Sequence, residues 1–269
     1  MKRAQAFAKI NLGLVVGPLR DDGKHEVATV LQRVDLADEI ELEPAAALTI
    51  VGFDDDTLVR GALEALAHGA GVVPRWRIRI GKRIPVAAGL GGGSSDAAYA
   101  LGLANAELPE PMSPPALHAI AAAIGADVPF FLCGGAQLAT GDGTALQAVD
   151  LPTDYVVVLV VPHRRAKEST AAVYRAFDAR DGAAGFDERR AALLGALARV
   201  EHARDLARLP RNDLAPSPLA EQLAKLGAFR ADVTGAGPTV YGLFEHAADA
   251  ERAVAEVSRV GKTWLTRPV

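Results

Sequence analysis

The chain has 269 residues, a formal net charge of −4 from 29 basic and 33 acidic side chains, and a single cysteine, Cys133. Without a long basic block, the sequence predicts neither a nucleic-acid nor a membrane partner and favours a small-molecule partner. One cysteine excludes an internal disulfide framework and a cysteine-based zinc site. With no long apolar run at the N-terminus or elsewhere, the composition predicts a cytoplasmic protein.

The first half of the chain begins with predicted strands and continues with predicted helices. Apolar spacing predicts strands at 10–16, 26–35 and 39–50, with a break at Ala37-Asp38 between the last two. A helix at 57–67 and a half-exposed strand at 76–80 follow. Further helices are expected at 95–107 and 115–124, on either side of a Pro-rich turn. Strands first and helices later favour an α+β fold.

A second domain is predicted to begin after Leu151-Pro-Thr-Asp154, where a hydrophobic strand at 155–161 restarts the pattern. The size of the chain also favours two domains, which we expect at 1–150 and 151–269. The remaining elements expected in the second domain are helices at 169–177, 187–209 and 218–226, a hairpin at 231–244, a helix at 247–260 and a strand at 264–267. No internal repeat is visible.

The most informative segment is Ile84-Pro-Val-Ala-Ala-Gly-Leu-Gly-Gly-Gly-Ser-Ser-Asp-Ala-Ala98. Glycine lets the backbone come close to a ligand, and the start of a helix adds a positive end, so this composition predicts a phosphate-binding loop. No Lys follows the glycines as in a Walker loop, and the last glycine of a dinucleotide fingerprint is missing. The segment is therefore a phosphate loop of a third kind.

Lys9 and Asn11 lie two residues apart, hence on one face of a strand, and could present an ammonium and an amide to one ligand. The alternative is a solvated face of an edge strand, where Lys is common.

Asp127 precedes Pro129 and an apolar run, which suits a helix N-cap. If instead it faces Lys9 across a pocket, its carboxylate could take a proton from a hydroxyl while the cation steadies the charge. With a phosphate loop, this pair would suffice for a small-molecule kinase.

A further glycine-containing segment, Thr234-Gly-Ala-Gly-Pro238, lies between two strand-like runs. It could be an ordinary hairpin loop, or its small residues could close one side of a phosphate site.

These segments, in this order, resemble the superfamily of galactokinase, homoserine kinase, mevalonate kinase and phosphomevalonate kinase. Within it, the details are similar to the 4-diphosphocytidyl-2-C-methyl-D-erythritol kinases. The segments that carry this similarity are Ala8-Lys-Ile-Asn11, Asp22-Gly-Lys-His-Glu26, Ile84 to Ala98, Gly125-Ala-Asp-Val-Pro129 and Thr234-Gly-Ala-Gly237. The match spans nearly the whole chain.

The resemblance implies phosphorylation by ATP of the 2-hydroxyl of a cytidine-diphosphate-linked methylerythritol, a step of the non-mevalonate route to isoprenoid precursors. It also implies a GHMP kinase fold, with an N-terminal domain like the second domain of ribosomal protein S5, a ferredoxin-like C-terminal domain and the active site between them. Mg²⁺ would accompany ATP. No residue is assigned as its ligand; Asp96 and Asp127 are the nearby acids.

The resemblance also implies a role for each site residue. Asp127 would be the base, and Lys9 would polarise the hydroxyl. Residues expected to contact the substrate are Asn11, Lys24, His25 (at the cytosine edge), Thr170 and Tyr174. Residues expected to form the ATP loop are Pro85, Val86, Ala87, Ala88, Gly89, Leu90, Gly91, Gly92, Gly93, Ser94 and Ser95.

Two of the substrate residues also have ordinary interpretations. Tyr174 could stack on cytosine or could be a core aromatic, and a lone His25 would ordinarily be a surface residue.

The sequence departs from the family pattern at Lys24, where the family usually has tyrosine. An aromatic face for cytosine is lost there unless the Lys stem packs against the base. Phe7 replaces a usual proline, Thr57 a frequent asparagine, and the C-terminal loop lacks one hydroxyl but keeps both glycines.

Three alternatives remain open at this stage. The chain could be another small-alcohol kinase, such as a homoserine or mevalonate kinase, or a non-catalytic ligand-binding member of the fold. An RNA-binding module is disfavoured by net acidity and by the lack of clustered basic and aromatic residues. Monomer and homodimer are both open.

Overall fold

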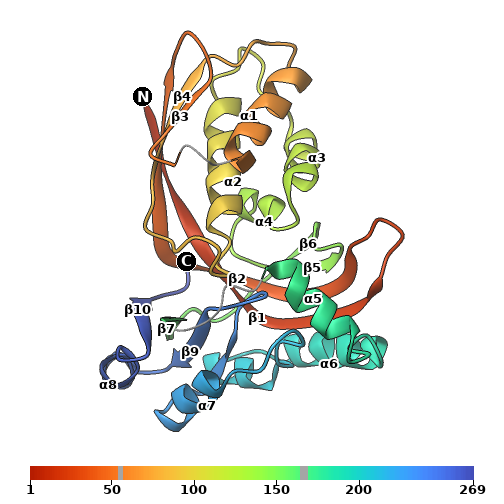
Figure 1. The fold of residues 1–269 in the computed structure, drawn as a ribbon, viewed down its shortest axis with the longest axis vertical. Coiled ribbons are helices and arrows are strands. Elements are labelled where there is room, and N and C mark those ends of the chain that lie inside the picture. Colours follow the sequence, from red (N-terminus) through yellow and green to blue (C-terminus); the bar gives the residue numbers. More distant parts are fainter. Residues whose placement is uncertain (54–56, 164–168) are drawn as a thin grey trace. The chain divides into compact units, whose positions relative to one another are not determined.

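A computed structural model describes residues 1–53, 57–163 and 169–269 (Figure 1). The chain forms two compact units, and each is assembled from several segments. Unit 1 comprises Met1–Ala8, Leu36–Ala87 and Gly91–Gly134, and unit 2 comprises Lys9–Asp35, Ala88–Leu90 and Gly135–Val269. The long strands β1 (Lys2–Leu19) and β2 (His25–Pro44) therefore contribute residues to both units. The domain boundary near residue 150 stays a prediction.

Unit 1 consists of paired strands and a group of helices. The C-terminal part of β2 pairs antiparallel with β4 (Trp76–Gly81), and β3 (Thr49–Val51) pairs with β4 in parallel. Helices α1 (Thr57–Gly69), α2 (Gly92–Asn105), α3 (Pro114–Ile124) and α4 (Val128–Leu132) pack against one another. β4 alternates buried apolar with exposed residues, as its sequence predicts.

The predicted break at Ala37-Asp38 is wrong, because β2 runs without interruption through these residues to Pro44. Asp38 is fully buried, yet it does not interrupt the strand, since its carboxylate accepts hydrogen bonds from Lys82 and from the backbone N–H groups of Arg83 and Ile84. A buried polar group with its hydrogen bonds satisfied is tolerated inside a sheet.

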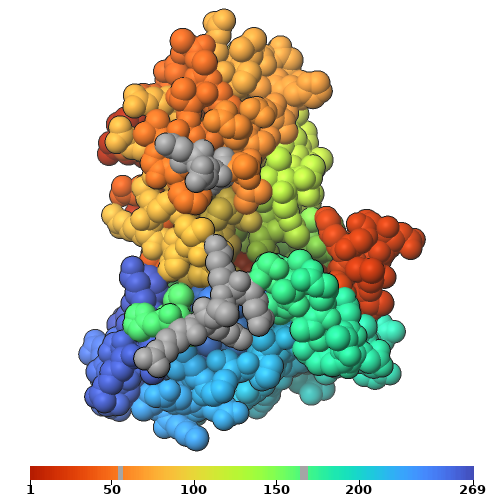
Figure 2. Space-filling model, in the orientation of Figure 1, coloured from red at the N-terminus to blue at the C-terminus, as the bar shows by residue number. Residues whose placement is uncertain are grey.

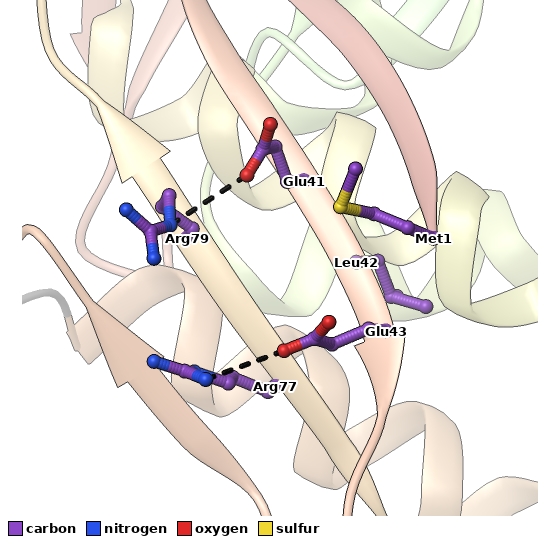
Figure 3. Close-up of a pocket in the computed structure, with 6 residues that line it drawn as sticks. All are labelled: Met1, Glu41, Leu42, Glu43, Arg77 and Arg79. Carbon is purple, nitrogen blue, oxygen red and sulfur yellow. Dashed lines mark hydrogen bonds and ion pairs between the residues drawn. The ribbon is translucent and has the colours of Figure 1, made fainter.

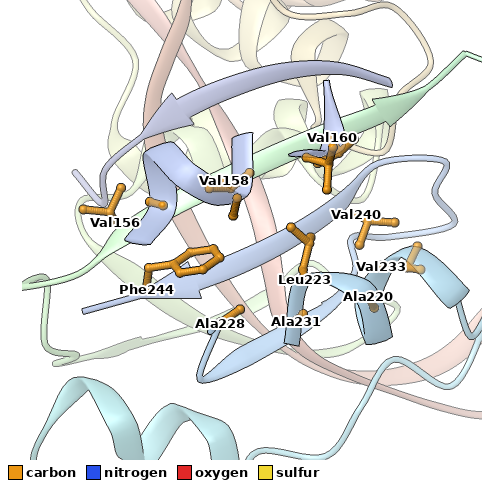
Figure 4. Close-up of a cluster of buried hydrophobic side chains, with 13 residues drawn as sticks. Val156, Val158, Val160, Ala220, Leu223, Ala228, Ala231, Val233, Val240 and Phe244 are labelled. Atoms are coloured by element: carbon orange, nitrogen blue, oxygen red, sulfur yellow. The ribbon is translucent and has the colours of Figure 1, made fainter. Parts of the chain in front are cut away.

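Unit 2 contains a four-stranded antiparallel sheet in the order β10-β7-β9-β8. Its strands are β7 (Val156–Pro162), β8 (Arg230–Val233), β9 (Val240–Phe244) and β10 (Gly261–Thr266). Helices α7 (Pro218–Lys225) and α8 (Ala247–Val257) pack on this sheet around a cluster of Val, Ala, Leu and Phe side chains (Figure 4). This strand order confirms the ferredoxin-like prediction, and β8 and β9 are the predicted hairpin.

Two further strands of unit 2 were not predicted from the sequence. β5 (Ala136–Gly141) pairs antiparallel with residues 27–31 of β2 and with β6 (Ala145–Val149). β6 is mostly exposed and lacks the alternation of buried and exposed side chains that marks a half-buried strand, so its sequence gives little signal.

The long helix predicted at 187–209 is two shorter elements. α6 (Phe186–Leu197) ends at Leu197, and a 3₁₀ helix, η1 (Ala203–Arg208), follows. The Asp205 carboxylate accepts hydrogen bonds from the backbone N–H groups of Glu201 and His202, which starts a new turn where the sequence pattern continues unbroken.

Helices α5 (Thr170–Asp178) and α6 expose much of their length to solvent, and Figure 2 shows both on the surface of unit 2. Within the three described ranges, no helix combines the length and apolar character needed to cross a bilayer.

Candidate active site

The glycine loop adopts the geometry of an anion-binding turn. Ala87, Gly89 and Gly91 have positive φ angles of 52°, 81° and 70°. Helix α2 begins at Gly92, three residues before the predicted start at Ser95. Gly92, Gly93 and Ser94 therefore lie in the first turn, where backbone N–H groups have no partner within the helix and can bind an anion. Ser95 is buried, and its hydroxyl donates to the carbonyl of Phe7 at 2.7 Å.

The middle of the glycine loop is bound to two other segments of unit 2. The Lys9 N–H donates to the Leu90 carbonyl at 2.9 Å, and the Thr239 N–H donates to the Ala88 carbonyl at 3.2 Å. The loop is thus fixed on one side by β1 and on the other by the C-terminal glycine segment.

Gly89 has no room for a side chain. A Cβ at this position would lie 2.5 Å from the carbonyl oxygen of Thr234 and 3.0 Å from that of Gly237. The Thr234 hydroxyl also lies 3.2 Å from the Gly89 carbonyl oxygen, to which it can donate. Glycine is needed here both for its positive φ and for this close approach.

Lys9 and Asn11 are buried and joined, as their shared strand face predicts. The Lys9 side-chain ammonium donates to Asn11 Oδ1 at 2.7 Å, and Lys9 is only 3% exposed. Asn11 Nδ2 donates to the Thr29 hydroxyl at 2.8 Å, and this hydroxyl donates to the Gly13 carbonyl at 2.7 Å. The interpretation as a solvated edge strand is therefore wrong.

The segment after β8 lies beside this pair. The Asn11 N–H donates to the Thr234 hydroxyl oxygen at 3.1 Å. A Cβ on Gly235 would lie 3.5 Å from Lys9 Nζ and 3.6 Å from Asn11 Oδ1. The segment is a hairpin loop, and its glycine also leaves space directly against the Lys9 ammonium.

Asn212 was missed by sequence reasoning. Its Nδ2 donates to the carbonyls of Val233 and Gly235 at 2.9 and 2.7 Å, and its Oδ1 accepts from the Leu214 N–H at 2.8 Å. It holds the C-terminal glycine segment in place. A lone Asn in a loop carries no signal of such a contact, because its partners lie 21 and 23 residues further along the chain.

Asp127 occupies the N-cap position of the short helix α4, as predicted, but its carboxylate makes no capping hydrogen bond to that helix. Capping alone therefore does not account for a half-buried carboxylate here. Asp127 belongs to unit 1 and Lys9 to unit 2. The pairing of the two residues stays a prediction.

His25 and Tyr174 come together in unit 2. Their ring centroids are 4.9 Å apart with the planes tilted by 36°. The His25 side chain is 7% exposed, so the interpretation as a surface residue is wrong. Tyr174 is half-buried against a small apolar cluster, while Thr170 lies on the same helix one turn earlier and is exposed.

Asp178 is a second residue that sequence reasoning missed. Its Oδ1 lies 2.8 Å from His25 Nε2. A carboxylate only accepts hydrogen bonds, so Nε2 carries a hydrogen, and in the neutral ring Nδ1 is left as an acceptor. Asp178 follows Tyr174 by four residues on α5, and this helical spacing is the signal that could have found it.

Lys24, which replaces the usual tyrosine, directs its ammonium to Asp142 at 2.7 Å. Thr144 also donates its hydroxyl to Asp142 at 2.6 Å. Burial raises the pKa of Asp142, but the hydrogen bonds from Lys24 and Thr144 outweigh it and lower that pKa to about 2. The ammonium is thereby held by an ionised partner.

The acids near the loop do not form a protein cage for a metal ion. Asp96 is fully buried, and one of its oxygens accepts from the Lys82 ammonium at 2.7 Å. No group of three or more His, Cys, Asp or Glu side chains suited to a metal occurs in the part of the chain that the structure describes.

A small pocket of about 70 Å³ lies on the strands of unit 1 (Figure 3). Its charged side chains are paired, with Arg79 3.6 Å from Glu41 and Arg77 3.3 Å from Glu43. None of the predicted site residues lines it. The residues that do are Met1, Glu41, Leu42, Glu43, Arg77 and Arg79.

Comparisons with known proteins agree with this arrangement. The GHMP kinases N terminal domain matches residues 57–135, and the GHMP kinases C terminal domain matches residues 183–263. A 4-diphosphocytidyl-2-C-methyl-D-erythritol kinase of Salinispora arenicola is 41% identical over 95% of this chain and 87% of its own length. One of Deinococcus radiodurans is 40% identical over 97% of this chain and 90% of its own length.

The fold has close relatives among solved structures. A crystal structure of 4-(cytidine 5'-diphospho)-2C-methyl-D-erythritol kinase superposes with a TM-score of 0.79 at 32% identity, covering 99% of both chains. The mevalonate kinase of Methanococcus jannaschii superposes with a TM-score of 0.76 but is 12% identical over 100% of this chain and 98% of its own, so it shares the fold alone. This chain therefore belongs to the 4-diphosphocytidyl-2-C-methyl-D-erythritol kinases, within the GHMP kinase family.

Proposed function

We propose that this chain transfers the γ-phosphoryl group of ATP to the 2-hydroxyl of 4-diphosphocytidyl-2-C-methyl-D-erythritol, in the non-mevalonate route to isoprenoid precursors. It is a small-molecule kinase. The observation that carries the proposal is the buried Lys9: its backbone N–H binds the Leu90 carbonyl of the glycine loop, and its ammonium is oriented by Asn11 and lies against Gly235. A fixed cation beside an anion-binding loop is what phosphoryl transfer requires, because the reaction depends on positioning and on neutralising charge.

The glycine loop is proposed to hold the phosphates of ATP. Residues 85–95 offer backbone N–H groups at alternating positive φ angles, and the first turn of α2 adds its free N–H groups and the positive end of the helix dipole. Mg²⁺, when bound with ATP, would neutralise part of the phosphate charge.

Asp127 is proposed as the base. Its carboxylate would accept the proton of the 2-hydroxyl as that oxygen bonds to the γ-phosphorus, while the bond from the γ-phosphorus to the β,γ-bridging oxygen breaks and ADP leaves. Lys9 would polarise the same hydroxyl and stabilise the charge that develops on it. The contact between Lys9 and Asn11 would keep the ammonium in one position, which makes Asn11 part of the same arrangement.

His25 and Tyr174 are proposed to recognise the cytosine. With Nε2 bound to Asp178, the neutral His25 ring presents Nδ1 as an acceptor, which matches the amino group of cytosine and not the carbonyl of uracil. Tyr174 offers a half-buried aromatic face next to it. Thr170 and Lys24 complete the proposed substrate contacts, Lys24 through its stem because its ammonium is held by Asp142.

The protein is proposed to act in the cytoplasm as a monomer or homodimer, without nucleic-acid or membrane partners. Its proposed domains are the N-terminal ATP-binding part, 1–150, and the C-terminal part, 151–269.

Substitution of the base tests this function. Asp127→Asn keeps the size of the side chain but cannot accept the proton, so we expect kcat with ATP and the cytidine substrate to fall by about 10²–10⁴-fold. ATP affinity, measured by calorimetry without the acceptor, should stay unchanged. The matched control is Asp187→Asn, an exposed acid in the first turn of α6, which should keep full activity.

The alternatives predict other outcomes of the same experiment. A non-catalytic binding protein would bind ATP without phosphoryl transfer in the wild type. If wild type and Asp127→Asn turned over equally, Asp127 would not be the base.

A further inference from the structure

A group of three ionisable residues, two of them fully buried, lies next to the glycine loop, and the proposed mechanism does not use it. Lys82, just after β4, donates to Asp38 Oδ2 on β2 at 2.5 Å and to Asp96 Oδ2 on α2 at 2.7 Å. Both carboxylates are fully buried, and the Lys82 side chain is 17% exposed. All three residues belong to unit 1.

Asp38 fixes the chain where it enters the loop. Its Oδ1 accepts from the Arg83 N–H at 2.5 Å and from the Ile84 N–H at 2.8 Å. These two backbone groups immediately precede residues 85–95. The position of the loop's first residue therefore depends directly on a side chain of β2.

Lys82 links this anchor to the other end of the loop. Asp96 lies in the second turn of α2, directly after Ser95, the last residue of the proposed loop. The Lys82 ammonium is also close to the first turn, because a Cβ on Gly92 would lie 3.4 Å from Nζ. One partly buried ammonium thus connects the residues before the phosphate loop with those after it.

Stability alone is a weak reason for such a group. Burying charged groups costs desolvation energy that their mutual attraction offsets only with good geometry, and apolar replacements are often as stable. Here Asp96 Oδ1 is buried with no hydrogen-bond partner among the described residues, so the group is not fully satisfied.

We infer that Asp38, Lys82 and Asp96 are positioning residues for the phosphate loop, which fix the distance between its two ends and so set the affinity for ATP. This inference rests on the proposed function for the identity of the ligand. The residues do not touch the reacting atoms, so they should affect ATP binding and leave the chemical step nearly unchanged.

The group should also make ATP binding sensitive to pH. Burial, and then the Asp38 carboxylate, raise the pKa of Asp96 to about 8. Asp38 on β2 and Lys82 after β4 are the charged groups that face it. Below this pH Asp96 is neutral. When it ionises, a negative charge appears one residue from the phosphate loop and should weaken ATP binding.

The test measures ATP affinity of the full chain by calorimetry without an acceptor, together with kcat at saturating ATP. Asp38→Asn places an amide N–H₂ either against the Lys82 ammonium or against the backbone N–H groups of Arg83 and Ile84. One of these donors then loses its acceptor, so we expect ATP affinity to fall on the order of tenfold or more. Its kcat should stay within about twofold, because the reacting groups are unchanged. Glu43→Gln, which breaks an exposed ion pair with Arg77 on the same two strands, is the control and should bind ATP normally.

Asp96→Asn provides a second readout that does not depend on the folding of Asp38→Asn. Its amide has the size of the acid but does not ionise, so this variant lacks any pH dependence of ATP affinity that comes from Asp96. Between about pH 7 and 9, wild-type affinity should fall while that of Asp96→Asn stays level.

Two outcomes would overturn the inference. One is a folded Asp38→Asn protein whose ATP affinity equals that of the wild type, and the other is the same pH profile for wild type and Asp96→Asn. ATP binding is measured without the acceptor, so it can be tested apart from phosphoryl transfer. If ATP affinity changes as expected in the variants but the wild type does not phosphorylate the cytidine substrate, the proposed function is wrong and the inference stands.

Discussion

His25 illustrates how a neighbouring side chain can decide what a residue recognises. The contact from Nε2 to Asp178 at 2.8 Å leaves Nδ1 of the neutral ring as the acceptor, and this tautomer would match the amino group of the cytosine that His25 is proposed to bind. The sequence alone identified His25 and Tyr174 through resemblance, but it gave no hydrogen position for the ring. That information comes from a residue 153 positions away.

Replacing Asp178 should therefore weaken substrate recognition without slowing the chemistry. Asp178→Asn can donate to the ring as well as accept from it, so it no longer specifies one tautomer, and we expect KM for the cytidine substrate to rise on the order of tenfold with kcat nearly constant. Steady-state kinetics at saturating ATP measure this. Asp181→Asn, at an exposed position of positive φ that Asn tolerates, is the control. An unchanged KM in Asp178→Asn would remove Asp178 from the site.

The raised pKa of Asp96 also predicts that the free energy of unfolding depends on pH. Its pKa is raised by burial from 3.8 in the unfolded chain to about 8. Between these values the folded chain binds more protons than the unfolded chain, so the contribution of this group to stability falls as pH rises, by at most about 1.4 kcal/mol per pH unit. Asp96→Asn lacks this titration. Its free energy of unfolding relative to wild type, measured in urea, should rise from about pH 5 to pH 8; a constant difference would contradict the assignment.

At the scale of elements, sequence patterns predicted the strands and helices best where their apolar residues are regular. Strands β4 and β7 and helices α1 and α8 were predicted within a few residues, because their apolar residues follow the period of the element. β2 was divided in error at Asp38, since a carboxylate in a strand is normally a sign of exposure. The hydrogen-bond partners of Asp38 lie 44 to 46 residues away, and no local sequence pattern reveals them.

The candidate site was predictable to a similar extent. The two-residue spacing of Lys9 and Asn11 placed them on one face, and their direct contact confirms it. The start of α2 was predicted three residues too late, because Gly92 and Gly93 are poor helix formers and yet form its first turn. Backbone N–H groups in that turn have no partner within the helix and can bind an anion. Asn212 and the group around Lys82 depend on tertiary contacts alone.

The glycine loop itself can be tested with a matched pair of substitutions. Gly89→Ala and Gly71→Ala both place alanine at positive φ, 81° and 66°, which costs about 1 kcal/mol each. Only at Gly89 does the new Cβ meet a backbone oxygen, that of Thr234 at 2.5 Å, whereas Gly71 has open space. We expect Gly89→Ala to lose a further 1–3 kcal/mol or so in urea unfolding and to bind ATP more weakly. Equal losses of unfolding free energy in the two variants would show that the glycine loop and the segment at Thr234 do not pack closely at Gly89.

At the scale of the whole molecule, the chain builds its compact units from interleaved segments. β1, β2 and the glycine loop each contribute residues to both units. Residues of the loop that is proposed to bind ATP therefore belong to both units. A sequence read for composition and periodicity suggests a single boundary and does not reveal this interleaving, because the contributions of residues 9–35 and 88–90 are set by contacts with segments far along the chain.

As a whole, the molecule is proposed to phosphorylate a cytidine-linked alcohol. The most direct measurement is ADP release with ATP, Mg²⁺ and 4-diphosphocytidyl-2-C-methyl-D-erythritol, run beside homoserine and mevalonate as acceptors. We expect ADP release with the cytidine compound only, in amounts equal to the phosphorylated product. ADP release with homoserine or mevalonate, and none with the cytidine compound, would contradict this function. It would indicate that Lys24, in place of the usual tyrosine, belongs to a changed substrate pocket.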